Sequence, residues 1–93
     1  MIWKHSGVTY DIQLSKRKGK KLQATYLNKE TGRKNTIHFG EAGYQHFYDK
    51  SELLPKSLNH NDLVRRQRYI DRHKSREDWS IPSAGMLSKN ILW

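Results

Sequence analysis

The sequence predicts an α+β fold: a small antiparallel three-stranded sheet followed by an arginine-rich helix and a short C-terminal helix. Two patterns support this class. In the first 40 residues apolar and polar residues alternate, which is the period of a half-buried strand. After residue 60 the apolar residues recur at helical spacing. The 93 residues are expected to form a single domain, with a β-meander at 1–40, a connection at 41–60 and a helical cover at 61–93.

Three segments with this alternation are expected to form the sheet. Lysine-rich and polar turns that contain Gly19 and Gly32 separate them, and glycine permits the tight turns of a meander. The apolar positions of the three strands are Val8, Tyr10, Ile12 and Leu14, then Leu22, Ala24 and Tyr26, then Ile37 and Phe39. A three-stranded sheet with one apolar face requires a cover.

The arginine-rich helix is predicted to run from about Leu63 to Arg76, because Asn61 or Asp62 can cap its first free amides. Helical spacing places three arginines on one face and a thin apolar stripe on the other. The arginines are Arg65, Arg68 and Arg72, and the stripe is Leu63, Gln67 and Ile70 with His73 at its edge.

The C-terminal segment is predicted to form a second short helix, from Ala84 to about Asn90, with Ser83 as its cap. The apolar tail that follows is expected to fold back onto the domain or to dock on a partner. The residues expected to act as core or interface anchors are Trp79, Ile91, Leu92 and Trp93.

The charge balance predicts an anionic partner. Lysine and arginine number 18 against nine acids, a formal net charge of +9, which suits nucleic acid, an anionic membrane or an acidic protein face. The candidate contact residues form a helical cluster and a hairpin-loop cluster: Arg65, Arg68 and Arg72, and Lys16, Arg17, Lys18, Lys20 and Lys21. The alternative for a charge run is a solvated surface without a partner.

Other classes of protein receive no support from composition. The absence of cysteine excludes disulfides and thiolate metal sites. No apolar run approaches transmembrane length, and the N-terminus lacks the apolar core of a signal peptide. We therefore expect no membrane partner and a location in the cytosol or inside a particle.

The titratable residues do not predict catalysis, a cofactor or a metal. His38 could pair with His46 or His73, but no spacing matches a known ligand motif, so hydrogen-bonded histidines are expected. Asp71 and its neighbours Glu77 and Asp78 lie among basic residues and are expected to form ion pairs. Six aromatic residues could stack bases or serve as packing anchors: Trp3, Tyr44, Phe47, Tyr48, Trp79 and Trp93.

Four runs of sequence suggest a family. They are IHFGEAGY at 37–44, RYIDRH at 68–73, REDW at 76–79 and PSAGMLSKNILW at 82–93. With these motifs in order, the chain resembles a family of small basic proteins from large DNA viruses of the algal-virus type and from tailed bacteriophages. It departs from that family in a longer linker at 48–55. The resemblance implies a viral source and a role in the virion or on the genome, and it carries over no catalytic residues.

Three functions follow as expectations. The first is a minor structural component of a viral or phage particle, which bridges coat or connector proteins in several copies and faces packaged DNA. The second is a nucleic-acid-binding accessory protein without sequence preference. The third is a phage inhibitor of a host defence complex. The expected location is the virion, or otherwise the host cytoplasm.

Overall fold

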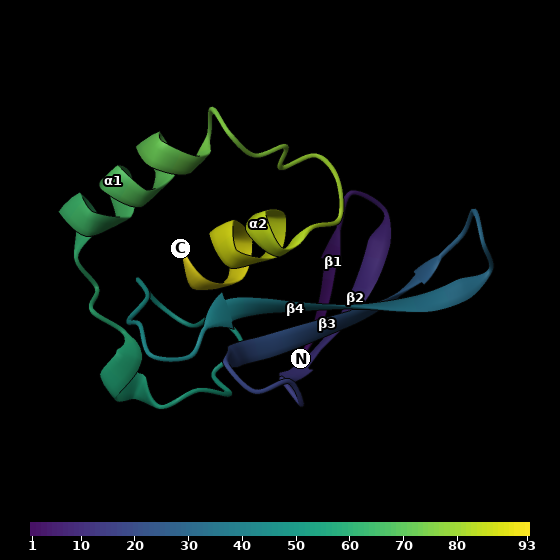
Figure 1. Cartoon of the computed structure of the whole chain (residues 1–93), viewed down its shortest axis with the longest axis horizontal. Coiled ribbons are helices and arrows are strands. Elements are labelled where there is room, and N and C mark those ends of the chain that lie inside the picture. Colours follow the sequence, from purple (N-terminus) through teal and green to yellow (C-terminus); the bar gives the residue numbers. More distant parts are fainter.

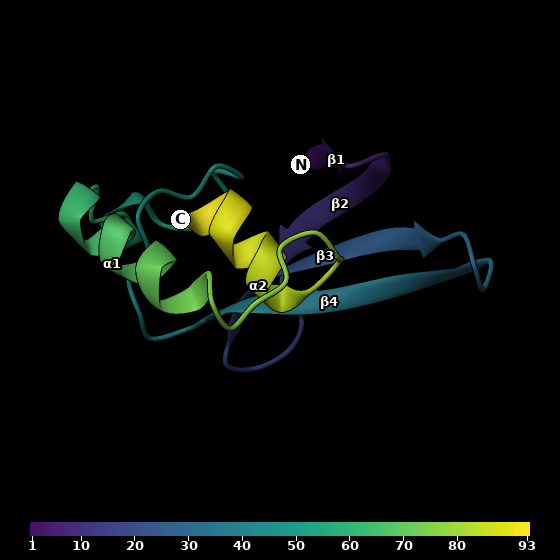
Figure 2. The ribbon, with the colours of Figure 1, turned by 90° about the horizontal axis from the view of Figure 1, so that it is seen from above.

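A computed structural model describes residues 1–93 and confirms the α+β class. An antiparallel sheet in the order β1-β2-β3-β4 forms one layer, and the C-terminal segment lies across one face of it (Figures 1 and 2). The elements are β1 (Ile2–His5), β2 (Val8–Leu14), β3 (Lys20–Asn28), β4 (Arg33–Glu41), the 3₁₀ turn η1 (Lys56–Leu58), α1 (Leu63–His73), α2 (Ala84–Leu87) and the π-helical turn η2 (Ser88–Leu92). No helix is long or apolar enough to cross a membrane.

The prediction of three strands is wrong, because residues before Val8 add a fourth. β1 pairs with β2 across a tight turn in which Ser6 and Gly7 both have positive φ, at 50° and 76°. That combination is the type I′ geometry that suits the twist of a hairpin. The Trp3 ring packs on Tyr10 with 5.4 Å between centroids. β1 is only four residues long, so its alternation is too brief to separate it from a loop.

The inner face of the sheet follows the predicted alternation. Five of its side chains are almost completely buried: Tyr10, Ile12, Leu22, Ala24 and Phe39. The register places Ile12 and Ile37 on either side of Ala24, and Phe39 beside Leu22. Each strand of the meander therefore contributes to one continuous apolar surface, which needs a cover of its own.

The C-terminal segment supplies that cover, as predicted. The Ser83 hydroxyl accepts a hydrogen bond from the Met86 amide at 3.1 Å and caps α2. From α2 and η2, four apolar side chains complete the core: Met86, Leu87, Ile91 and Leu92. Trp79 and Trp93 are half-buried at its margin. The tail therefore folds back onto the domain and does not need a partner to be buried.

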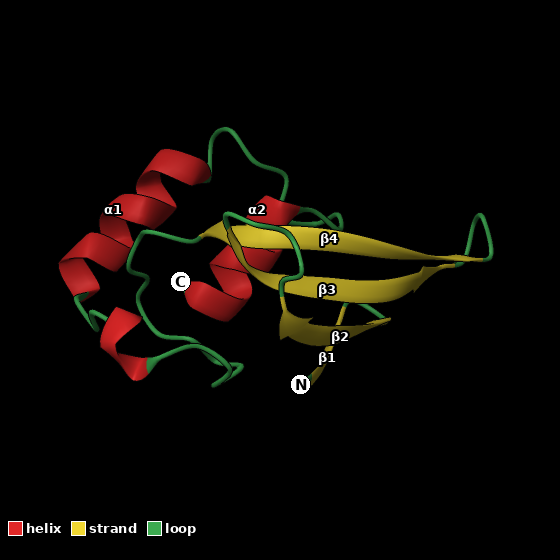
Figure 3. Ribbon diagram, turned by 60° about the horizontal axis from the view of Figure 1, so that its bottom comes forward, coloured by secondary structure: helices red, strands yellow, loops and turns green.

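The prediction that α1 covers the sheet is wrong. The helix lies beyond the end of the sheet, next to the C-terminal turn (Figures 1 and 3), and none of its residues is fully buried. Its inward face is rotated in part from the expected one: Ile70 and His73 are half-buried as expected, but so are Arg66 and Tyr69, whereas Leu63 is 70% exposed. The physical reason is the surface on which α1 rests, which is aromatic and polar.

Two contacts with Trp93 attach α1 to the core. The rings of Tyr69 and Trp93 stack with 4.3 Å between centroids and 2° between planes. Arg66 donates from Nε to the main-chain oxygen of Trp93 at 2.6 Å and lies over the Phe47 ring at 5.6 Å. An arginine and a tyrosine thus make the contacts that the apolar stripe was expected to make, because a π-stack and a charged hydrogen bond suit this surface better than an aliphatic side chain.

We expect Leu92→Ala to reduce the free energy of unfolding by about 2–5 kcal/mol, the usual range for removing a buried leucine side chain. Leu92 is 1% exposed and closes the core from the C-terminal side. Thermal and urea unfolding followed by circular dichroism measure the loss. The matched control is Leu27→Ala, at a strand position that is 52% exposed. Equal losses in the two variants would contradict the assignment of the C-terminal turn to the core.

Candidate functional site

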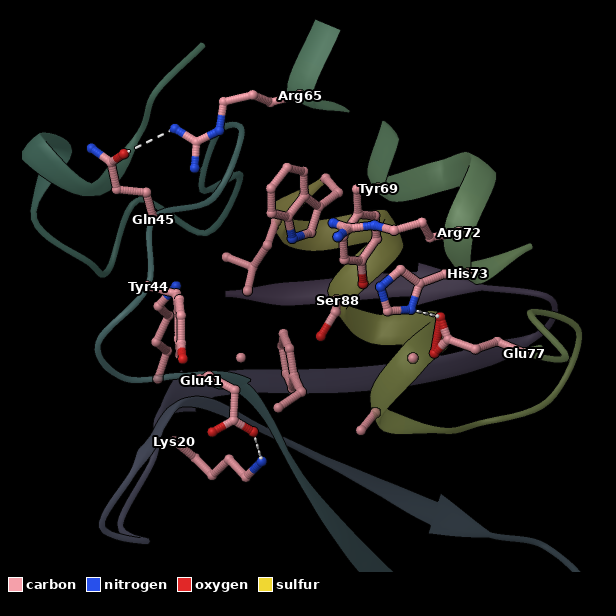
Figure 4. Close-up of a pocket in the computed structure, with 17 residues that line it drawn as sticks. Lys20, Glu41, Tyr44, Gln45, Arg65, Tyr69, Arg72, His73, Glu77 and Ser88 are labelled. Carbon is pink, nitrogen blue, oxygen red and sulfur yellow. Dashed lines mark hydrogen bonds and ion pairs between the residues drawn. The ribbon is translucent and has the colours of Figure 1, made fainter. Parts of the chain in front are cut away.

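The candidate site is a hollow of about 470 Å³ between α1, the C-terminal segment and the adjoining ends of β3 and β4. Figure 4 shows α1 side chains along one wall and residues of the segment after β4 along the opposite rim. Phe39, Gly40 and Leu92 belong to its apolar floor. The hollow exists because α1 projects past the end of the sheet, so nothing fills the angle between them.

The wall from α1 carries arginines that have no ion-pair partner. Asp62 caps the helix by accepting from the Val64 and Arg65 amides at 2.9 and 3.2 Å, as expected from the sequence. Arg65 and Arg72 line the hollow, and Arg68 joins them around a second depression of about 440 Å³ that Asp71 and Trp93 also line. Arg65 donates to the Gln45 side chain at 3.0 Å, and none of the three arginines forms an ion pair.

Tyr69, His73 and Glu77 form a fixed cluster at the inner end of this wall. Tyr69 stacks on His73 with 4.1 Å between ring centroids, and His73 Nδ1 lies 2.8 Å from Glu77 Oε1. Burial, with the negative charge of Glu77 as a further cause, raises the pKa of the Tyr69 hydroxyl to about 12. The phenol therefore stays neutral at physiological pH and contributes no negative charge beside the arginines.

The position of Glu77 depends on a glycine in α2. A Cβ added at Gly85 would lie 1.8 Å from Glu77 Oε2, far inside van der Waals contact. Only glycine leaves room for the carboxylate at this point. The small size of Gly85 thus allows the Glu77 carboxylate to lie beside His73 at the edge of the hollow.

The opposite rim comes from β3 and from the segment after β4. Lys20 forms an ion pair with Glu41, which neutralises both side chains on this side of the hollow. Tyr44 stands at the rim with 71% of its surface exposed, and Gln45 reaches across to Arg65. Figure 4 shows Tyr44 facing open space, with the α1 side chains on the far side.

A buried polar network behind this rim holds Tyr44 and Gln45 in place. Lys21 Nζ lies 3.2 Å from His46 Nδ1, and His46 Nε2 lies 2.7 Å from Asn59 Oδ1. Because Lys21 donates to Nδ1, His46 is neutral and donates from Nε2 to Asn59. The Asn59 oxygen also accepts from the Asp49 amide at 2.9 Å. These bonds join residues 46–59 into one unit.

Burial is the main cause of the pKa shifts in this network. It lowers the pKa of the Lys21 amine, while the carboxylates of Asp49 and Glu41 oppose the shift. Burial, followed by the positive charge of Lys21, lowers the pKa of His46. Both shifts follow from placing two basic groups together where water is excluded.

The structure separates the predicted loop cluster into parts. Lys16, Arg17 and Lys18 are exposed in the β2–β3 loop, whereas Lys20 and Lys21 belong to strand β3. Lys21 also lines the hollow, but its side chain is mostly buried and bonded to His46, unlike the exposed side chains of the loop. Lys20 lines the same hollow as Arg65 and Arg72, so the two clusters do meet at this end of the sheet.

Sequence reasoning missed Tyr69 as a structural residue and His46 as the centre of a network. Helical spacing puts Tyr69 on the flank of the arginine face, and its stack with Trp93 depends on a contact across 24 positions that no local pattern reveals. No local pattern marks His46, which stands between Gln45 and Phe47 in an irregular segment and is fully buried in the folded chain.

The other histidines and the acids have local partners. His38 Nδ1 lies 2.8 Å from Ser15 Oγ, and no group of three or more potential metal ligands lies together. Asp71 pairs with Lys74 at 3.5 Å, as expected from their spacing. The expectation that Asp78 forms an ion pair is wrong, because it accepts from the Ser80 amide at 2.9 Å and caps a turn.

A family model matches part of the chain. Residues 10–52 match a family of unknown function, DUF5754. The matched segment contains most of β2, all of β3 and β4, and the rim with Tyr44 and His46, but it ends before α1. No curated protein and no solved structure matches the chain. The similarity to viral and phage proteins therefore stays a prediction from the sequence motifs.

We expect the fold to lose stability as the pH falls below about 6.5, and His46→Gln to reduce that loss. The folded pKa of His46 is lowered from 6.5, so the unfolded chain binds the proton more tightly. Stability is then complete above the unfolded pKa and falls as the pH drops toward the folded one. His60, with a pKa lowered chiefly by burial, acts in the same direction, so His46→Gln reduces the slope without abolishing it.

Melting temperatures of the parent and of His46→Gln across this pH range measure the effect. His5→Gln is the control, because His5 lies in the edge strand β1, where it stacks on Trp3. A slope that is the same in the parent and in His46→Gln would show that the buried network does not titrate.

Proposed function

We propose that this protein is a non-enzymatic nucleic-acid-binding protein that contacts phosphates without reading sequence. The observation that carries the proposal is the group of three exposed arginines on α1, Arg65, Arg68 and Arg72, which share one surface and form no ion pair. Arginine contacts to phosphate oxygens supply affinity that does not depend on base identity.

The unpaired state of these arginines follows from their surroundings. Asp71 is the one acid of α1, and it accepts from Gln67 at 2.9 Å and pairs with Lys74. Glu77 is held by His73 at 2.8 Å, and Glu41 by Lys20. Each nearby carboxylate thus has another partner, so the arginine charges are available to a ligand.

The spacing suits a linear polyanion. Seven helical residues separate Arg65 from Arg72, a rise of about 10 Å. That length corresponds to about three phosphate steps along one strand of B-form DNA. A formal charge of +9 and the exposed basic residues of the β2–β3 loop at the same end of the sheet add long-range attraction.

The motif resemblance suggests where this binding would take place. In a viral or phage particle, the polyanion would be the packaged genome, and the protein would be a minor structural component between the genome and coat or connector proteins. Mass spectrometry of purified particles tests that placement, because a structural component is present at a fixed ratio to the coat protein.

We expect the triple variant Arg65→Gln, Arg68→Gln, Arg72→Gln to weaken binding to all nucleic-acid sequences alike. The slope of log affinity against log salt should fall by about one for each phosphate that an arginine no longer neutralises, so by about three. Fluorescence anisotropy over a salt series measures it. The matched control removes three charges at the far β3–β4 hairpin, with Lys29, Arg33 and Lys34 changed to Gln. Equal effects in the two variants would show that the net charge of the protein, and not the arginine face of α1, determines the affinity.

We also expect no cleavage of DNA or RNA in the presence of magnesium, manganese or zinc. The carboxylates Asp71, Glu77 and Asp78 are each bonded to a neighbour and do not converge on one point. Gel assays with each ion over several hours provide the measurement. Cleavage that disappears in Asp71→Asn or Glu77→Gln would refute a purely binding role.

A further inference from the structure

We propose that the hollow beside α1 receives one unstacked nucleobase, so that the protein prefers single-stranded nucleic acid or strand ends over intact duplex. This inference rests on the proposed function and names the part of the ligand that occupies this site. The lining residues that carry it are Tyr44, Arg65 and Arg72, with Glu41 and Glu77.

The charged side chains around the hollow suit a phosphate in one part and a base in another. Arg65 and Arg72 lie on the α1 wall and also line the second depression with Arg68, where a backbone would run. Two carboxylates also line the hollow: Glu41 at the opposite rim, paired with Lys20, and Glu77 at the inner end of the α1 wall, paired with His73. A phosphate there would meet two carboxylates, whereas an uncharged base can donate to them from its amino groups.

Tyr44 provides a free aromatic face. The other rings near the hollow already stack on one another, since Tyr69 lies between His73 and Trp93 at 4.1 and 4.3 Å. Tyr44 is 71% exposed and stands at the opposite rim, facing the open space (Figure 4). Exposed rings beside a basic surface are the usual stacking platforms of single-strand binders.

The rim that carries Tyr44 is fixed before any ligand arrives. The next side chain but one is His46, which is fully buried and bonded to Lys21 and Asn59. Gln45 is bonded to Arg65 across the hollow at 3.0 Å. A platform that is followed directly by two anchored residues loses little conformational freedom when a base stacks on it.

The size of the hollow agrees with one nucleotide. Its volume of about 470 Å³ lies within the range of small-ligand pockets. A base inside a duplex would have to leave its stack to enter, which carries an energetic penalty. The same phosphate contacts therefore give tighter binding to a single strand, where bases are already free.

The experiment compares a fluorescent oligonucleotide of about 12 residues with the same strand in a duplex, at one salt concentration. We expect the parent to bind the single strand at least about fivefold more tightly. Tyr44→Ala should weaken single-strand binding by about 5- to 150-fold, the range for losing one stacked base, and leave duplex binding and the salt slope unchanged. Tyr44→Phe should retain the parent affinity, because it keeps the ring.

Tyr48→Ala is the matched control, since Tyr48 is 40% exposed on the same segment and does not line the hollow. Melting curves establish that each variant is folded. If the parent binds both ligands and Tyr44→Ala weakens neither, or weakens both equally, the base-binding inference is wrong while the phosphate-binding function stands. If the parent binds neither ligand, both proposals fail. If an acidic peptide binds to the protein and neither oligonucleotide does, the hollow is a protein-binding site and the inference is again wrong.

Discussion

The packing of the C-terminal turn on the sheet is the contact on which the other features depend. Ile91 and Leu92 are buried against the inner face of the meander, and this contact positions the following residue, Trp93, beside the end of the sheet. Trp93 then supplies both the ring on which Tyr69 stacks and the oxygen to which Arg66 donates. The arginine helix therefore has its place because the core is closed from the C-terminal end.

Weak attachment of α1 explains why its arginines are available. A helix that covered the sheet would bury an apolar stripe, and its arginines would lie over a core. Here the helix buries no side chain completely, and it rests on two aromatic and polar contacts at the edge of the domain. The face that carries Arg65, Arg68 and Arg72 is exposed. The helix is thus held weakly, and its cationic surface stays exposed.

The long connection between β4 and α1 is organised by polar contacts instead of apolar packing. Lys21, His46, Asn59 and Asp49 join the end of the sheet to this segment by buried hydrogen bonds. Such networks are specific in geometry because an unsatisfied member is strongly destabilising in a low-dielectric environment. The network explains how a segment with little regular structure presents Tyr44 and Gln45 at defined positions, and why a lysine of the basic cluster lies inside the protein.

Local patterns in the sequence were sufficient to predict the α+β class, three of the strands, both helix caps and the burial of Ile91 and Leu92. These features depend on the spacing of apolar residues along the chain and on side chains that bond to residues a few positions away, as Asp62 and Ser83 do. The fourth strand, the rotation of α1 onto Tyr69 and Arg66, and the burial of Lys21 became visible only in the folded chain. The rotation of α1 and the burial of Lys21 each depend on a contact between distant segments, Tyr69 with Trp93 and Lys21 with His46. A pattern along the chain records which side chains are apolar, but it does not record which surface each will meet.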